Sequence, residues 1–256
     1  SLFEQLDKKG INAKERSIID RCVGEVYEEY QHGGAVPTLR VLREKFLEQE
    51  EPEAQDLALV SELFINGSLD AFAHESNVDV NNRIMVYDIL DLGKQLKTMG
   101  LLVITDAMLN RVTENWKQGK RTHIFLDEFH VVFENEYSGA FFNSAWRRFR
   151  KRNAFPTAIT QNVEYLLDSV LASTMISNSE YIVMLNQAEP DRAKLATLLN
   201  ISTEQMGYIT NADAGCGLVK YGSSLVPFVN RFPTNTRLYK LMTTKPGEDS
   251  INRGRM

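Results

Sequence analysis

The segment HIFLDEF, residues 123–129, constrains the fold most, because a short apolar run ends in two neighbouring acids. Residues 123–126 are apolar or nearly so, which is typical of a short strand buried on both faces of a sheet. Asp127 and Glu128 repel each other and are costly to desolvate without partners. Such a strand ends either at the edge of a ligand site or in a plain transition to a solvated loop.

The periodicity of the chain predicts a helical region followed by an alternating region. Asn12 and Glu15 form a capping-box pattern at the start of the first helix. From residue 83 onward strands alternate with helices, which predicts an α/β fold with a largely parallel sheet. Helices are expected at 12–30, 37–48, 53–64, 93–120, 139–152, 162–175, 189–200 and 202–210. Strands are expected at 83–89, 123–127, 156–160 and 180–185, followed by a hairpin of 216–222 and 224–230.

Length and composition restrict the class of protein. The 256 residues have room for one large domain or two modest ones, and the net charge of -5 excludes a basic nucleic-acid coat but not a local basic patch. The two cysteines are far apart and in no metal-like spacing, which suits a reducing cytoplasm. No apolar stretch approaches the ~18 residues of a membrane span, and no signal peptide opens the chain. Membrane association is therefore expected only through partners or through segments outside this sequence.

The two acids and a later glutamine are the first candidate site residues. At the carboxyl end of a strand, where α/β sheets bind ligands, Asp127 can hold a magnesium ion through water. Glu128 can orient or deprotonate an attacking water, which is the Walker B arrangement. Gln161 follows the next expected strand, so its amide would lie beside the acids and report a γ-phosphate. The alternatives are a plain strand-to-loop transition for the acids and a helix start capped by Thr160 for Gln161.

The basic run WRRFRKR, residues 146–152, is the next candidate. Its helix is expected to bury one apolar face, made of Phe142, Ala145, Trp146 and Phe149. Arg147, Arg150 and Lys151 would then share another face of this helix. A solvated face is the plainest interpretation, and a nucleic-acid contact or an arginine finger for a neighbour's phosphate are the functional ones.

Other chemistries lack their motifs. The sequence contains no Gly-x-x-x-x-Gly-Lys-Ser/Thr loop to cradle phosphates, and AGCGLVKYGSS has the wrong glycine spacing. His123 and His130 flank the acids but lack the two-histidine spacing of a zinc hydrolase. There is no Gly-x-Ser-x-Gly elbow, and neither cysteine has a neighbouring base. If the chain belongs to a nucleotide hydrolase, its main phosphate grip is missing from this sequence.

Taken together, several stretches resemble the C-terminal ATPase domain of conjugation and type IV secretion ATPases, the CagE/TrbE/VirB group, in versions from Gram-positive conjugative elements. The likeness extends from about residue 2 to residue 246. It rests on motifs that occur together and in order: AKERSIIDR, NVDVNNRIMVYDILDLGKQLKTMG, GKRTHIFLDEFHVVFENEYSG, ITQNVEYLL, SNSEYIVMLNQAEPDRAKLATLLNIS and FPTNTRLYKLMTTKP.

The resemblance implies a partial RecA-like P-loop NTPase core of the FtsK/HerA type with an all-α subdomain. We expect the all-α insertion at 1–82, the C-terminal part of the core at 83–246 and a flexible tail at 247–256. The implied cofactors are ATP and Mg²⁺. The implied setting is a ring-like homo-oligomer at the cytoplasmic face of a membrane-spanning transfer channel, with other channel proteins as partners and DNA as a candidate partner.

The resemblance also assigns roles to residues. Asp127 and Glu128 match the Walker B pair, and Gln161 matches the glutamine after the next core strand. The family's arginine and lysine region is matched by Arg147, Arg150, Lys151 and Arg152. The departure is the Walker A loop, which precedes the helical insertion in the family, so we expect this chain to start after it.

Three functions remain open at this point. The first is part of a motor ATPase that powers DNA or protein transfer, or channel assembly. The second is a nucleic-acid-binding module whose acidic pair is vestigial, and the third is a scaffold that docks channel proteins through its helical domain. Because the phosphate loop is missing, we expect no magnesium-dependent ATP turnover from these 256 residues alone.

Overall fold

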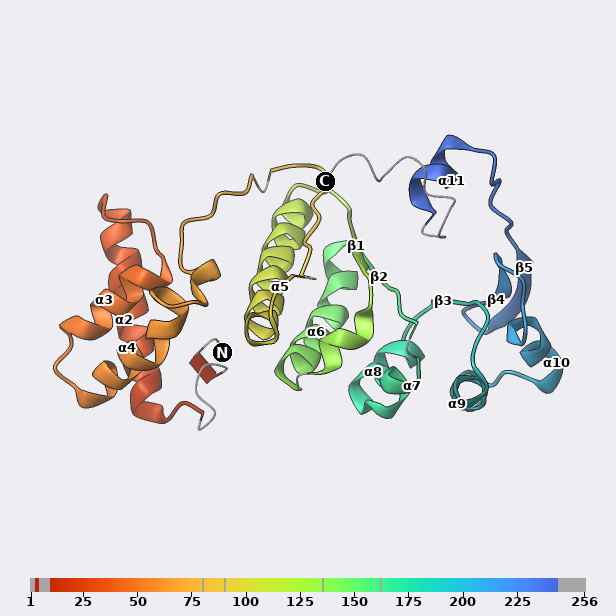
Figure 1. Cartoon of the computed structure of the whole chain (residues 1–256), viewed down its shortest axis with the longest axis horizontal. Helices are drawn as coiled ribbons and strands as arrows, with labels where there is room; N and C mark the ends of the chain where they lie inside the picture. The colour runs from red at the N-terminus through yellow and green to blue at the C-terminus, as the bar shows by residue number, and fades with distance from the viewer. Residues whose placement is uncertain are drawn as a thin grey trace. The chain divides into compact units, whose positions relative to one another are not determined.

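The structure is a computed structural model, and it describes residues 3–4, 10–79, 81–89, 91–134, 136–161 and 163–243. The chain divides into two compact units, Ser1–Thr122 with Lys151–Ala154, and His123–Arg150 with Phe155–Met256. Figure 1 shows the elements along the chain. The expected domain division at residue 82 stays a prediction, and the expected tail at 247–256 lies outside the described residues.

The first unit contains three helices, and the first of them starts at its predicted cap. They are α2 (Ala13–Gln31), α3 (Leu39–Glu48) and α4 (Pro52–Ile65). Asn12 accepts hydrogen bonds from the backbone N–H of Glu15, and the Glu15 carboxylate accepts one from the Asn12 N–H at 2.7 Å. This confirms the capping box, which satisfies two N–H groups that a helix start leaves open. Thr38 caps α3 in the same way through the N–H of Val41.

The three helices enclose their own apolar core. Phe46 and Cys22 are fully buried in it, and Phe3 meets Phe46 edge-on at a ring distance of 5.5 Å. Helical spacing places the remaining core members on the inward faces: Ile18, Val26, Leu42, Ala54, Leu57 and Ala58. Burial of the Cys22 thiol raises its pKa, which keeps it an inert apolar side chain.

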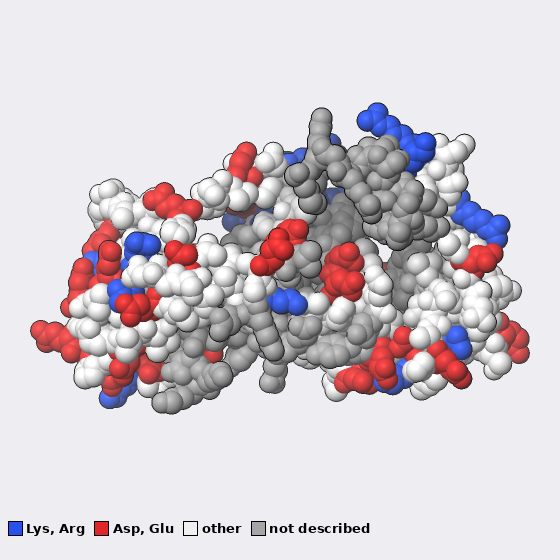
Figure 2. All heavy atoms as spheres, viewed as in Figure 1, with Lys and Arg blue, Asp and Glu red and all other residues white. Residues whose placement is uncertain are grey.

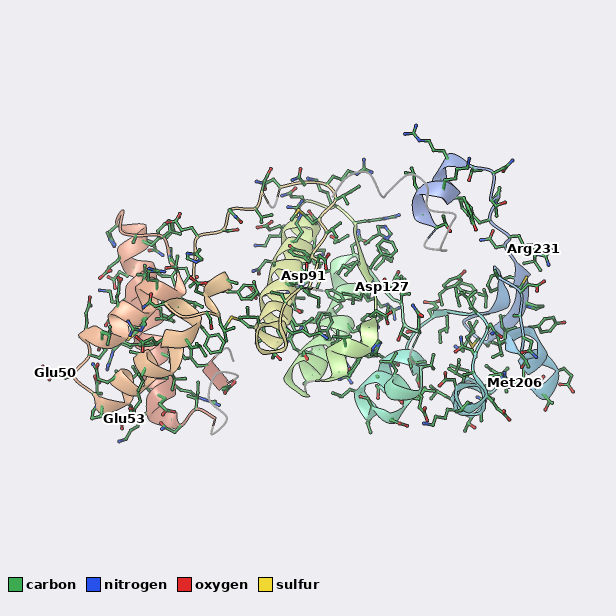
Figure 3. The ribbon with its side chains drawn as sticks, in the orientation of Figure 1. Glu50, Glu53, Asp91, Asp127, Met206 and Arg231 are labelled. Carbon is green, nitrogen blue, oxygen red and sulfur yellow. The ribbon has the colours of Figure 1, made fainter. Side chains whose placement is uncertain are left out.

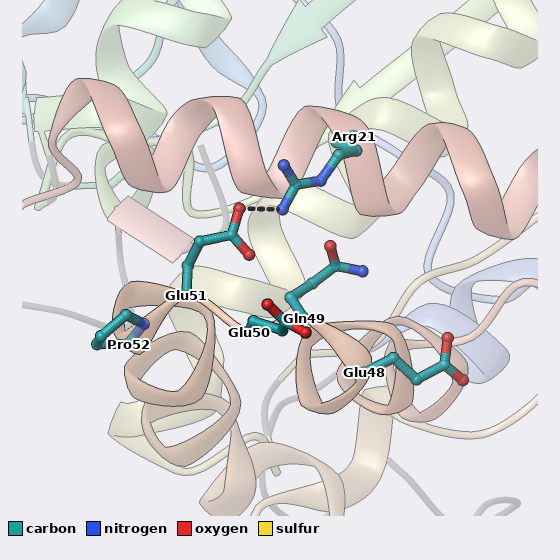
Figure 4. A pocket seen from close by; sticks show the side chains of 6 residues that line it. All are labelled: Arg21, Glu48, Gln49, Glu50, Glu51 and Pro52. Carbon is teal, nitrogen blue, oxygen red and sulfur yellow. Dashed lines mark hydrogen bonds and ion pairs between the residues drawn. The ribbon is translucent and has the colours of Figure 1, made fainter.

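Ion pairs join the helices around this core. Lys45 lies 2.7 Å from Glu29 of α2 and 2.8 Å from Glu48, and its hydrogen bonds to these carboxylates hold the pKa of Lys45 above its ordinary value. Arg21 donates to Glu51 at 2.7 Å across the shallow pocket of Figure 4. On the face shown in Figure 2, acidic and basic side chains are interspersed over these helices. Exposed pairs of this kind contribute little individually, so the apolar core supplies most of the stability.

The predicted strand at 83–89 is wrong. After α4 come the 3₁₀ helix η1 (Asp70–Phe72) and an extended stretch in which the described residues form no helix or strand before α5. Ile84 and Val86 are 80% and 83% exposed. Alternating apolar residues make a strand only when a neighbouring strand pairs with their backbone, and none of the described strands does so.

The helix α5 (Lys94–Lys117) confirms the long helix predicted here. Its buried residues include Met99, Thr105 and Val112. Near its end Asn115 donates to the Thr122 hydroxyl at 2.9 Å, which fixes the reversal of the chain into the first strand.

The strands β1 (Thr122–Leu126) and β2 (Ala154–Ala158) form a two-stranded parallel sheet. The N–H of Thr122 donates to Asn153 at the start of both strands, and the N–H of Ile159 donates to Leu126 at their ends. Between the strands lie η2 (Phe129–Glu134), α6 (Glu136–Phe149) and η3 (Arg150–Arg152). The prediction that β1 is buried on both faces is wrong, because Phe125 is 69% exposed while Ile124 is buried.

The remaining strands form a separate antiparallel sheet in the order β3 (Tyr181–Met184), β4 (Cys216–Tyr221) and β5 (Ser224–Val229). The expected hairpin is confirmed, with Gly222 at a φ of +57° in its turn. A largely parallel sheet was expected, but among the described strands only β1 and β2 pair in parallel. β3, β4 and β5 pair antiparallel, and a two-residue turn joins β4 to β5. The helices of this part are α7 (Val163–Asp168), α8 (Val170–Ser177), α9 (Glu189–Leu199), α10 (Thr203–Met206), η4 (Gly207–Ile209) and α11 (Arg237–Met242).

One glycine allows β3 and β4 to approach each other. A Cβ atom on Gly217 would lie 2.1 Å from the carbonyl oxygen of Met184. Leu218, beside it, is buried in a core that the sheet shares with α9: Met184, Leu195, Leu199, Ile201 and Ile209.

The core of the helical unit gives a stability prediction. Phe46→Ala should lower the free energy of unfolding by about 3–5 kcal/mol, because it empties a fully buried ring site. Leu59→Ala in α4 is the control, since Leu59 is 67% exposed and should change the value by less than about 0.5 kcal/mol. Chemical denaturation followed by circular dichroism measures both, and equal losses would contradict the described core.

Candidate functional site

The two acids form the turn that ends β1. Asp127, labelled in Figure 3, follows the last strand residue directly, and its carboxylate accepts the N–H of Glu128 at 2.9 Å. Glu128 has a φ of +46°, in the left-handed region that non-glycine residues rarely adopt. The N–H of Val131 then donates to the Glu128 carbonyl at 3.0 Å and starts η2. The chain therefore reverses at the acids and leaves both carboxylates at the carboxyl end of the strand.

A single residue beyond β2 holds this turn from both sides. The N–H of Ile159 donates to the carbonyl of Leu126 at 2.8 Å, and the carbonyl of Ile159 accepts the N–H of Phe129 at 2.9 Å. These two bonds bracket Asp127 and Glu128. The exit of β2 therefore determines where the acids lie.

The residue after the acids anchors the turn in an aromatic cluster. Phe129 is buried and lies 5.2 Å from Phe133, 6.2 Å from Phe142 and 5.6 Å from Trp146 between ring centroids. Aromatic contacts at these distances favour specific relative ring orientations. The cluster thus fixes the chain on the far side of Glu128 against α6.

Two polar side chains contact Glu128, and a third contacts one of them. Gln161 donates from Nε2 to Oε1 of Glu128 at 3.4 Å, as the placement of Gln161 beside the acids predicted. Nδ1 of His130 lies 3.4 Å from Oε2 of Glu128 and 3.3 Å from the hydroxyl of Thr160. Both contacts to Glu128, at 3.4 Å, are longer than typical hydrogen bonds.

The basic run lies outside this arrangement. Phe142, Ala145 and Phe149 are buried, as predicted, and Trp146 is half-buried against Phe129. The exposed basic side chains are Arg147, Arg148, Arg150 and Lys151. Arg152 differs, because it is half-buried and donates to the hydroxyl of Thr113 in α5. In the part of the chain that the structure describes, no hydrogen bond or ion pair joins these basic residues to the acids.

The acids offer oxygen ligands of the kind that a magnesium ion accepts. Among the described residues, no group of three or more His, Cys, Asp or Glu side chains gathers as metal ligands. Mg²⁺ is often held by one or two carboxylates together with waters and substrate phosphates. Asp127 at the strand end supplies such a carboxylate, and the half-exposed Glu128 leaves room for water beside it.

Sequence reasoning missed the contributions of His130, Thr160 and Ile159. His130 was considered only as a metal ligand, and its position two residues after Glu128 was the available signal. Ile159 contributes only backbone hydrogen bonds to the turn, so no pattern of side chains in the sequence indicates this contribution.

The left-handed backbone at Glu128 gives a second stability prediction. Glu128→Gly should have a free energy of unfolding about 1 kcal/mol above that of Glu128→Ala, because glycine adopts this conformation without a Cβ clash. Glu114 in α5 is the matched control, where alanine should be better than glycine by about 1 kcal/mol. Chemical denaturation of the four variants tests this, and the same order at both positions would contradict the left-handed turn.

Comparison with known proteins agrees with the fold. No family model and no curated protein sequence matches the chain. A solved structure of VirB4 of Thermoanaerobacter pseudethanolicus matches with a TM-score of 0.71 over 91% of this chain and 68% of that chain. The two sequences are 21% identical over the match. The chain therefore has a mixed α/β fold similar to that of this VirB4.

Proposed function

We propose that the protein is part of a motor ATPase of type IV secretion or conjugation, which hydrolyses Mg-ATP to power DNA or protein transfer or channel assembly. The observation that carries the proposal is the Asp127–Glu128 turn at the end of β1, with Gln161 brought to Glu128 from the end of β2. The similarity of the fold to VirB4 supports the same class of machine.

Each residue of the turn has a distinct part in the proposed reaction. A bound Mg-ATP supplies the γ-phosphoryl group and the charge that polarises it. Asp127 would hold the magnesium ion through water. Glu128 would orient the attacking water and accept its proton, and Gln161, which contacts Glu128, would respond to the γ-phosphate.

The proposed site is incomplete in these 256 residues. Phosphoryl transfer also needs backbone N–H groups and a lysine around the β- and γ-phosphates, and the sequence holds no phosphate-binding loop motif. The proposal therefore requires such a loop from outside this sequence. Activity assays belong in a longer form of the protein that carries it.

The similarity to type IV secretion ATPases also supports a proposal for where the protein acts. We place the protein as a subunit of a ring-forming homo-oligomer at the cytoplasmic face of a membrane channel, held there by other channel proteins. Among the described residues, no helix has the length and apolar character needed to cross a membrane.

The exposed basic residues favour a second candidate function, the binding of nucleic acid. Arg147, Arg148, Arg150 and Lys151 project from the end of α6 and from η3, where they can contact phosphates. A purely structural role is the alternative, because basic residues in the last turn of a helix interact favourably with the helix dipole. Binding of DNA that weakens with salt and is lost on neutralising these residues would favour the nucleic-acid function.

Substitution of the acids tests the ATPase proposal. In the loop-containing protein, Glu128→Gln should lower turnover on the order of 100-fold or more while ATP binding survives, because the amide cannot accept the proton. Asp127→Asn should instead weaken magnesium-dependent ATP binding. Glu114→Gln, an exposed acid on α5, is the control and should leave turnover unchanged. Near-normal turnover of Glu128→Gln would remove Glu128 from the catalytic residues.

The basic run gives a prediction about neighbouring subunits. We propose Arg150 as an arginine finger, since it is exposed in the centre of the run whereas Arg152 is tied to Thr113. Arg150→Ala should lower turnover roughly 10³-fold. Mixing these subunits with Glu128→Gln subunits that retain Arg150 should restore activity in mixed rings. Absence of rescue, with mixed rings verified by mass spectrometry, would contradict a role in trans.

A further inference from the structure

The carboxylate of Glu128 is contacted from two different parts of the chain. Oε1 faces the amide of Gln161 and Oε2 faces Nδ1 of His130, each at 3.4 Å. The side chain of Glu128 is 47% exposed, so water reaches it as well. A carboxylate has about four lone-pair positions, and two contacts leave two of them for other donors. The contacts thus orient the carboxylate without blocking it.

The surroundings of His130 hold its ring in place beside the Glu128 carboxylate. It lies in η2 between Phe129 and Val132, which are both buried, and its own side chain is only 19% exposed. Its Nδ1 is also within 3.3 Å of the Thr160 hydroxyl, next to Gln161. The imidazole is therefore braced by the buried turn on one side and by the exit of β2 on the other.

The chemistry of the ring restricts how these contacts combine. A neutral imidazole carries its proton on one nitrogen only. Nδ1 attracts Oε2 of Glu128 only when it carries the proton, because an unprotonated Nδ1 would face the carboxylate with a lone pair. In the protonated form the Thr160 hydroxyl oxygen can accept from the same N–H. The contact with Glu128 thus selects the Nδ1–H tautomer.

We propose that His130 is a positioning residue for Glu128, which its Nδ1–H orients while Thr160 braces the ring and Gln161 holds the other carboxylate oxygen. The consequence for turnover rests on the proposed ATPase function. The contacts that carry this proposal join His130 to Glu128 and Thr160, so its loss should change the rate of the step that uses Glu128 and not the affinity for ATP. Groups that orient a catalytic or ligating side chain are typically worth about 10–100-fold in activity or affinity.

The contact itself is tested without any activity. The chain has four histidines, so a protein labelled with ¹⁵N in histidine gives few imidazole signals, and the signal of His130 is assigned with His130→Asn. In alkaline buffer, His130 should show the Nδ1–H tautomer. Glu128→Ala should shift it toward the Nε2–H tautomer that free histidine prefers. A predominant Nε2–H form in the wild type would overturn the proposal, and so would a tautomer ratio that is the same in the wild type and in Glu128→Ala.

The effect on turnover is tested in the loop-containing protein with three variants. His130→Ala should lower kcat on the order of 10-fold with an unchanged KM for ATP. His130→Asn places an amide N–H near the position of Nδ1 and should recover most of the rate, whereas His130→Gln places it near Nε2 and should not. His123→Ala is the matched control, because His123 is exposed on β1 and stacks on Phe155 at 5.2 Å.

The two proposals fail in different ways. If Glu128→Gln abolishes turnover while His130→Ala leaves kcat unchanged, the positioning role is wrong and the ATPase proposal stands. If the protein has no turnover although the tautomer responds to Glu128→Ala, the ATPase proposal is wrong and the contact stands. Equal losses of rate in His130→Ala and His130→Asn, with matching losses of stability, would show that His130 only supports the fold.

Discussion

Two backbone hydrogen bonds to Ile159 hold the acidic end of the parallel sheet together. The N–H of Ile159 donates to Leu126 and its carbonyl accepts from Phe129, so the turn between them is closed by the residue that follows β2. Without this closure, the repulsion between Asp127 and Glu128 would favour other turn conformations. With it, Glu128 adopts a left-handed backbone and its carboxylate faces Gln161 and His130. The pairing of β1 with β2 is thus a requirement for the site as well as a part of the fold.

The sequence predicted best what depends on near neighbours. The capping box of Asn12 and Glu15, the helix from Lys94 to Lys117 and the hairpin around Gly222 all rest on residues a few positions apart. The buried face of α6 followed from helical spacing for the same reason. The position of Gln161 beside Glu128 followed from one further assumption, that consecutive strands are neighbours.

The sequence predicted poorly what depends on distant partners. Ile84 and Val86 have the alternation of a strand, but an isolated extended segment gains nothing from that pattern until another backbone pairs with it. The apolar run of β1 was expected to be covered on both faces, yet burial is decided by what packs on each face, and the run itself does not specify this. The spacing of His130 from Glu128 was the one signal in the sequence, and its second partner, Thr160, is brought to it only when β2 pairs with β1.

Gly217 has a consequence for how this protein can vary. The space between its Cα and the Met184 carbonyl is too small for any side chain, since even a Cβ would lie 2.1 Å from the oxygen. In a scan of all substitutions, this position should therefore reject alanine and valine alike, although β-branched residues normally favour strands. Hydrophobic replacements at the partner Met184 do not relieve the restriction, because the obstacle is a backbone atom. At Gly217, evolution or design can therefore add a side chain of any size or polarity only if β3 and β4 move apart.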